Sequence, residues 1–181
     1  MNTSLTWHSD EYSSTEHCIV RQMVSGYEIL SNISGRYEDK AFEAKYLIAT
    51  NNDWQTTLTK VRLDTGNKRT ELLFVKNDNG TWYFDGRPDE RFDGCIDVDI
   101  PLTPFTNTLP VNRLKMAIGG SELIKVIYID VFEGIRTVQQ KYTRLSASTY
   151  KYENVPNDFE AVITMDDAGF ILEYPGLFRR V

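Results

Sequence analysis

Histidine and cysteine are scarce in this chain, with two of each among 181 residues. Cys18 and Cys95 have neither a metal-binding nor a redox spacing, so we expect two free thiols in a reducing compartment. Cys18 follows His17, but consecutive side chains on a strand point to opposite faces, which argues against a thiol–imidazole nucleophile. We therefore predict no metal site.

Long apolar runs are missing as well. The longest, residues 126–129, has the length of a strand, far below the roughly 20 residues that span a bilayer. Residues 1–16 are polar and contain no hydrophobic segment of a secretory signal. The chain also lacks the G-x-x-x-x-G-K, G-x-G-x-x-G, G-x-S-x-G and H-E-x-x-H motifs. We expect a cytoplasmic protein with no transmembrane segment and no cofactor.

Positive charge is not in excess either. The chain has 26 acidic and 20 basic residues and a net charge of −6. Binding of phosphate backbones needs clustered Lys and Arg, so we expect no nucleic-acid partner. The length fits one domain, and 41% hydrophobic residues are enough for a core. We predict one domain over residues 1–181, with residues 1–15 partly mobile, and make no prediction of oligomeric state.

What the chain does contain is a regular pattern of turns and strands. Clusters of Asn, Asp and Gly recur at 51–53, 64–67, 77–80, 154–158 and 166–169. The runs between them are rich in β-branched and aromatic residues. Alternating apolar residues at 42–49 and 159–165 predict strands with one buried face. Residues 123–132 are apolar on both faces, which predicts a strand covered on both sides.

These features are typical of an antiparallel, mostly β protein: a sandwich, a barrel or a roll. One helix fits the pattern, from a capping Asn107 to about Ala117, with Pro110 in its first turn and Gly119 and Gly120 at its end. An irregular loop over the same residues is the alternative.

Asp97 and Asp99 are the most suggestive polar pair. They are two residues apart on a predicted strand, so both carboxylates project from one face. Because Asp is disfavoured in strands, the pair indicates acid/base work, hydroxyl recognition or metal binding, although a metal needs further ligands. The alternative is a solvated outer face. For Arg113, the choices are a ligand contact or a salt bridge to Asp97 or Asp99.

Three segments form a distinctive combination: D-G-C-I-D-V-D at 93–99, T-P-F-T-N-T-L-P-V-N-R-L at 103–114 and Y-P-G-L-F-R-R-V at 174–181. The Y-K-Y-E of 150–153 belongs to the same pattern. Together they resemble one bacterial family, the "Putative glycolipid-binding" proteins, formerly a domain of unknown function. Phe178 departs from the pattern, where a Trp is expected. The resemblance extends from about residue 16 to the C-terminus, and the matching positions are Asp93, Gly94, Asp97, Asp99, Asn107, Pro110, Arg113, Tyr174, Pro175 and Gly176.

The resemblance implies a single, strongly curved antiparallel sheet, a spiral β-roll or half-barrel similar to lipoprotein carriers that hold acyl chains, with at most one or two short helices. It implies no catalytic residues. Our leading hypothesis is a binding protein for an amphipathic, glycolipid-like molecule. The candidate ligand-binding residues are a polar rim of Asp97, Asp99, Asn107 and Arg113 and an aromatic lining of Trp54, Trp82, Tyr128 and Tyr174.

Two other hypotheses stay open. One is an enzyme acting on a sugar or polyol through Asp97 and Asp99, which requires a polar cleft and a carboxyl with a raised pKa. The other is a non-catalytic interaction scaffold with a filled core. We favour the binding protein over the enzyme. The interior of the sheet distinguishes the three hypotheses.

Overall fold

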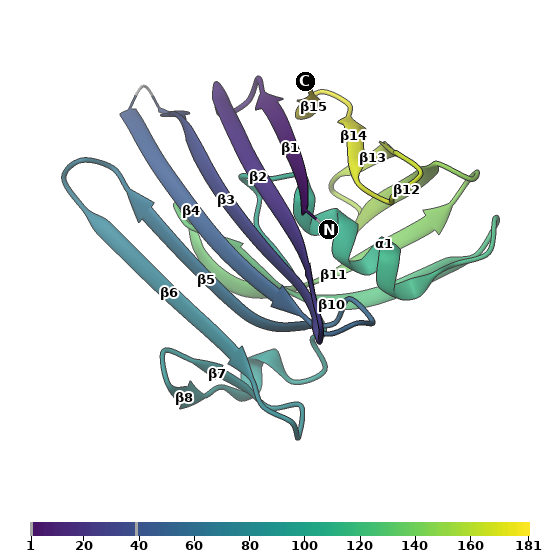
Figure 1. Ribbon diagram of the computed structural model, residues 1–181, viewed down its shortest axis with the longest axis horizontal. Coiled ribbons are helices and arrows are strands. Elements are labelled where there is room, and N and C mark those ends of the chain that lie inside the picture. The colour runs from purple at the N-terminus through teal and green to yellow at the C-terminus, as the bar shows by residue number, and fades with distance from the viewer. Residues whose placement is uncertain (1, 39) are drawn as a thin grey trace.

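One continuous sheet of 15 strands dominates the described part of the protein (Figure 1). A computed structural model describes residues 2–38 and 40–181; Met1, at the start of the predicted mobile segment, lies outside the described residues. The strand order is β8-β7-β6-β5-β4-β3-β2-β1-β15-β14-β13-β12-β11-β10-β9. All neighbours are antiparallel except β9 and β10, which run parallel. The prediction of a mostly β, curved antiparallel sheet is confirmed.

The strands are β1 (Asn2–Ser9), β2 (Ser14–Met23), β3 (Gly26–Tyr37), β4 (Lys40–Thr50), β5 (Thr56–Asp64), β6 (Arg69–Lys76), β7 (Trp82–Phe84), β8 (Arg87–Pro88), β9 (Asp97–Asp99), β10 (Ser121–Asp130), β11 (Gly134–Arg144), β12 (Thr149–Val155), β13 (Glu160–Met165), β14 (Ile171–Tyr174) and β15 (Phe178–Arg180). Short helical segments are η1 (Glu90–Phe92), η2 (Phe105–Asn107) and α1 (Thr108–Leu114). No helix of the described residues is long and apolar enough to cross a membrane.

Strand alternation follows the sequence pattern closely. On β4, Phe42, Ala44, Tyr46 and Ile48 are all buried, as the pattern at 42–49 predicts. On β10, the successive residues Val126 and Ile127 are both buried, so the middle of the strand is covered on both faces, whereas Leu123 near its start is exposed. The predicted Asn/Asp/Gly turns lie between strands, at β4–β5, β5–β6, β6–β7, β12–β13 and β13–β14.

Residues 2–9, within the segment 1–15 for which partial mobility is predicted, form a paired strand. Strand β1 lies in the middle of the sheet, paired with β2 on one side and β15 on the other. Leu5 and Trp7 of this strand are buried, and the indole nitrogen of Trp7 donates a hydrogen bond to the carbonyl of Ile171 at 3.0 Å. Pairing along both edges and burial of one face hold β1 in the sheet, although the sequence of the segment is mostly polar.

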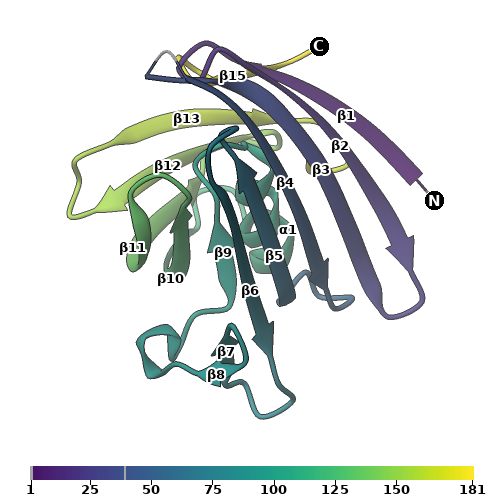
Figure 2. The same cartoon turned by 90° about the vertical axis from the view of Figure 1, so that its left-hand side faces the viewer.

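The interior of the roll is filled by the chain itself. Figure 2 shows β1–β6 arching over one side and β10–β13 on the other, with α1 between them. Phe105 of η2 packs edge-on against Trp7 and stacks with Phe170, at centroid distances of 6.4 and 6.3 Å. Leu109 of α1 is fully buried beside them in the same core. Residues 101–114, most of them buried, therefore occupy the interior of the roll. A filled interior is what the interaction-scaffold hypothesis predicts, so the binding hypothesis depends on a pocket at the rim of the sheet.

The helix is shorter than predicted. It begins at Thr108, directly after Asn107, and ends at Leu114, because Lys115 adopts a left-handed conformation with φ of 47°. Pro110 lies in its first turn, as predicted. The side chain of Asn107 makes no capping hydrogen bond; it accepts one from Tyr142 instead. Asn107 therefore holds the predicted N-cap position without a side-chain capping bond, whereas the expected end at Gly119 and Gly120 is wrong.

Candidate functional site

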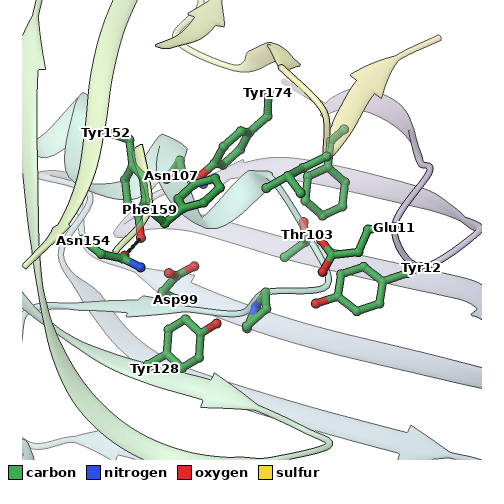
Figure 3. A pocket seen from close by; sticks show the side chains of 13 residues that line it. Glu11, Tyr12, Asp99, Thr103, Asn107, Tyr128, Tyr152, Asn154, Phe159 and Tyr174 are labelled. Atoms are coloured by element: carbon green, nitrogen blue, oxygen red, sulfur yellow. Dashed lines mark hydrogen bonds between the residues drawn. The ribbon is translucent and has the colours of Figure 1, made fainter. Parts of the chain in front are cut away.

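One pocket opens between the β1–β2 turn and the C-terminal half of the sheet (Figure 3). Its volume is about 210 Å³. The lining comes from five regions of the chain: the β1–β2 turn, β9 with the segment up to Asn107, β10, β12 with the turn that follows it, and the β14–β15 turn. The lining residues are Glu11, Tyr12, Asp99, Pro101, Thr103, Asn107, Tyr128, Tyr152, Asn154, Phe159, Tyr174, Leu177 and Phe178.

Asp99 is the central polar group of this pocket. Figure 3 shows its carboxyl between the side chains of Tyr128 and Asn154. One carboxyl oxygen accepts a hydrogen bond from the Thr106 hydroxyl at 2.9 Å, and the other accepts one from the Gln140 amide at 2.6 Å. Burial raises the pKa of Asp99, and these two hydrogen bonds partly oppose the shift. Because both donors are neutral, the carboxyl is oriented without a counter-charge.

Asn107 contributes its amide to the pocket wall. Its oxygen accepts a hydrogen bond from the hydroxyl of Tyr142 at 2.7 Å, and its nitrogen donates to the carbonyl of Pro104 at 3.3 Å. Tyr142 is fully buried, and Asn107 is almost so. These contacts hold η2 against β11 and fix the wall on which Asn107 lies.

Aromatic rings form one side of the pocket. Tyr152, Phe159 and Tyr174 lie in mutual contact, with centroid distances of 6.1 to 6.2 Å. The Tyr152 hydroxyl donates to Asn154 at 2.6 Å. Burial, and next the charge of Asp99, raises the pKa of Tyr128, Tyr152 and Tyr174. Their phenols therefore stay neutral and able to donate hydrogen bonds.

The electrostatic character of the pocket is acidic. Glu11 lies exposed at the mouth, where partial burial and the nearby Asp130 raise its pKa. None of the described lining residues is Lys, Arg or His. The pocket thus combines two carboxyls, several neutral donors and aromatic surface.

A second carboxyl network lies behind the pocket wall. Glu16 is buried and accepts hydrogen bonds from Ser31 and Tyr46, each at 2.7 Å. The Tyr46 hydroxyl is 3.2 Å from that of Thr103, which lines the pocket. Burial raises the pKa of Glu16 to about 7, although hydrogen bonds from Ser31, Tyr46 and Thr103 oppose the shift. One Glu16 oxygen, Oε2, has no hydrogen-bond partner.

The structure brings four of the eight predicted ligand-binding residues together in the pocket: Asp99, Asn107, Tyr128 and Tyr174. The other four lie elsewhere. Asp97 forms a buried ion pair with Arg113, as the salt-bridge alternative predicts. Trp82 is fully buried and donates to the carbonyl of Cys95 at 2.9 Å. Trp54 stacks on Tyr27 at 4.0 Å, beside a different surface pocket.

The alternative that Asp97 and Asp99 share a solvated outer face is wrong. Asp97 is completely buried, because β9 is covered by α1 through Arg113 as well as paired with β10. The two carboxyls therefore have different partners, Arg113 for Asp97 and the Thr106 and Gln140 side chains for Asp99. Among residues 2–38 and 40–181, no three His, Cys, Asp or Glu side chains lie close enough together to hold a metal ion.

Sequence reasoning missed Glu11, Glu16, Thr103, Tyr152 and Asn154. For Glu16 a signal was present: it occupies the buried register of β2 together with Ser14, Cys18 and Val20. A carboxyl on the apolar face of an alternating strand is unusual. The others come from turns and remote strands, whose meeting no local pattern reveals.

Comparisons with known proteins agree with this architecture. The sequence model of a family described as "Putative glycolipid-binding" matches residues 4–180. Among solved structures, the chain is similar to the crystal structure of a DUF1089 family protein from Pseudomonas aeruginosa. The two chains share 31% sequence identity, 92% of each is covered, and the TM-score is 0.81. A comparison with curated proteins gave no match.

Proposed function

The chain belongs to the "Putative glycolipid-binding" family, and from this premise we propose that it binds an amphipathic molecule by its hydroxyl-bearing head group in the pocket around Asp99. The observation that supports this most is the lining itself. It places a carboxyl, two amides and neutral phenols beside aromatic rings. The hydroxyls of a sugar can bond to the carboxyl, amide and phenol groups, and its C–H faces can pack on the aromatic rings. Tyr suits both contacts, because it has an apolar ring and a polar hydroxyl.

The size of the pocket limits what it encloses. Its volume of about 210 Å³ is below the roughly 300–1,000 Å³ of pockets that surround a whole drug-sized ligand. With residues 101–114 filling the roll, the space fits one head group and not a long acyl chain. We therefore place the head group of the ligand inside the pocket and its acyl chain outside the pocket, against the aromatic edge.

Phe159 offers an apolar surface for such a chain. Its side chain lines the pocket and stays 36% exposed, while its ring contacts Tyr152 and Tyr174. Leu177 and Phe178 extend this apolar edge on the β14–β15 side. Each methylene removed from water contributes about 0.8 kcal/mol, so a few methylenes covering this edge give useful affinity.

Of the eight predicted residues, we retain Asp99, Asn107, Tyr128 and Tyr174 as ligand contacts. We assign a supporting role to Asp97 and Arg113, since their ion pair fixes β9 and thereby the position of Asp99. Trp82 anchors the carbonyl of Cys95, just before β9. Trp54 belongs to the packing around Tyr27.

Calorimetric titration with octyl glycosides below their micelle concentration tests the proposal. We expect binding of the parent protein, and a loss of about fivefold or more in Asp99→Asn and Phe159→Ala, in line with one lost hydrogen bond or ring contact. Val162→Ala, on the exposed face of β13, is the matched control and should bind normally. Absence of binding for the whole glycoside panel, with no lipid retained in native mass spectrometry, would overturn the proposal.

A second candidate is an enzyme acting on a glycoside, favoured by one observation. Asp99 and Glu11 line the same pocket, and the pKa of each is raised, mainly by burial. Carboxyls with raised pKa values are typical of general acids. Asp97 cannot take part, because Arg113 holds it away from the pocket. Turnover of nitrophenyl glycosides that Asp99→Asn abolishes, with binding retained, would favour this candidate.

A further inference from the structure

We propose that the pocket selects a positively charged head group, a hydroxylated group bearing an ammonium such as an amino sugar, and rejects anionic head groups. This inference rests on the proposed function, because it names the head group taken by the same pocket. It begins from two carboxyls at different depths. Asp99 lies among the lining side chains and Glu11 at the mouth, on the β1–β2 turn (Figure 3).

The contrast between Asp97 and Asp99 is the first argument. Both lie on β9, and Asp97 has a cationic partner: the guanidinium of Arg113 contacts its carboxylate at 2.6 Å. The hydrogen-bond donors to Asp99 are the Thr106 hydroxyl, the Gln140 amide and the backbone of Ile100, all neutral. A carboxylate removed from water without a counter-charge is costly. A ligand that brings an ammonium to Asp99 supplies the charge that the protein does not.

The surroundings strengthen the negative field. Asp130 lies close enough to Glu11 to raise its pKa, and the charge of Asp99 raises the pKa of several pocket tyrosines. Arg136 is a positive charge that opposes this negative field. Its guanidinium lies over the ring of Tyr128, 4.4 Å from the centroid, and is not part of the pocket lining. A phosphate, sulfate or carboxylate would thus meet two carboxyls and no lining cation among the described residues.

The aromatic surface fits the same ligand. The faces of Tyr and Phe rings attract cations, most strongly where water is excluded. Tyr128, Tyr152 and Tyr174 keep neutral phenols, which can accept as well as donate hydrogen bonds to an ammonium or a hydroxyl. Carboxyls at two depths with aromatic walls between them match a head group that is both hydroxylated and cationic.

Three matched probes test the inference by calorimetry: octyl glucosaminide, octyl glucoside and octyl glucuronide, which share ring and chain and differ in one substituent. We expect the glucosaminide to bind about tenfold more tightly than the glucoside, since its ammonium supplies a counter-charge to the carboxylate that a hydroxyl cannot supply. We expect no measurable binding of the glucuronide. Equal binding of glucosaminide and glucoside would overturn the charge selection and leave the proposed function standing. Failure of all three to bind would overturn both.

Variants at the mouth make the test independent of folding. Asp99→Asn alters a half-buried group, whereas Glu11 is exposed on a turn. Glu11→Gln should reduce the preference for the glucosaminide over the glucoside about threefold or more. Glu11→Lys should reverse the order and admit the glucuronide. Glu122→Gln, on the exposed start of β10, is the control and should leave the order unchanged. An unchanged order in Glu11→Lys would contradict the inference.

Discussion

Arg113 binds Asp97 through two nitrogens, with Nη2 2.6 Å from one carboxylate oxygen and Nε 3.1 Å from the other. The two side chains are 13% and 1% exposed. This ion pair joins the last turn of α1, inside the roll, to the edge strand β9. It therefore sets the position of Asp99 two residues further along the strand.

Breaking this pair should destabilise the fold strongly. Asp97→Asn leaves a buried guanidinium without its counter-charge, which costs about 3–5 kcal/mol. Urea unfolding followed by circular dichroism measures the loss. The control is Glu28→Gln, which removes the more exposed pair with Arg21 and should cost less than about 1 kcal/mol. Similar losses in the two variants would contradict the structural role of the buried pair.

Glu16 should make stability fall as the pH rises. Its pKa is about 7 in the folded protein against an ordinary 4.5, so between these values the folded state holds a proton that the unfolded state has lost. The stabilisation is complete below about pH 4.5 and is lost as the pH approaches 7, by roughly 3 kcal/mol at most.

Glu16→Gln keeps a neutral side chain at every pH and should flatten this decrease. Urea unfolding of parent and variant at pH 5, 6, 7 and 8 measures the difference. Glu43→Gln, exposed on strand β4 of the same sheet, should keep the slope of the parent. A parent and a Glu16→Gln variant with parallel pH profiles would rule out the proposed ionisation.

Two turn glycines should differ sharply in tolerance. Gly26 ends the β2–β3 turn with φ of 145°, and a Cβ there would overlap the backbone carbonyl of Thr50. Gly66 has φ of 80° in the β5–β6 turn, with no atom near its missing Cβ. Gly66→Ala should cost about 1 kcal/mol from backbone strain alone, and Gly26→Ala on the order of 3–5 kcal/mol. Thermal unfolding should rank them in this order; the reverse order would contradict the local geometry.

Tyr142→Phe should destabilise the wall that carries Asn107. The change removes the hydroxyl that donates to the Asn107 oxygen and leaves that buried oxygen unpaired, at a cost of about 1–3 kcal/mol. Tyr152→Phe is the matched control, because its partner Asn154 is half-buried and water can replace the lost donor. Chemical unfolding should show the larger loss in Tyr142→Phe, and equal losses would argue against a buried, unpaired oxygen.

The strands themselves were predictable from the sequence. Alternation in β4 and the doubly apolar β10 are local signals, because side chains on a strand point to opposite faces with a period of two. The turns were predictable for a similar reason, since Asn, Asp and Gly tolerate the backbone angles of tight hairpins. Together with the family motifs, these signals indicated one curved antiparallel sheet.

The pocket and the filled interior depended on tertiary structure. Asp97 and Asp99 look equivalent in the sequence, yet one meets Arg113 of α1 and the other meets Gln140 of β11 and faces the pocket. That difference arises because residues 101–114 fold back into the roll. Local sequence specifies which residues alternate and where the chain turns, since these follow from neighbouring backbone geometry. Only the curvature of the sheet and the segment inside it decided which distant side chains meet, because such contacts depend on packing across the whole chain.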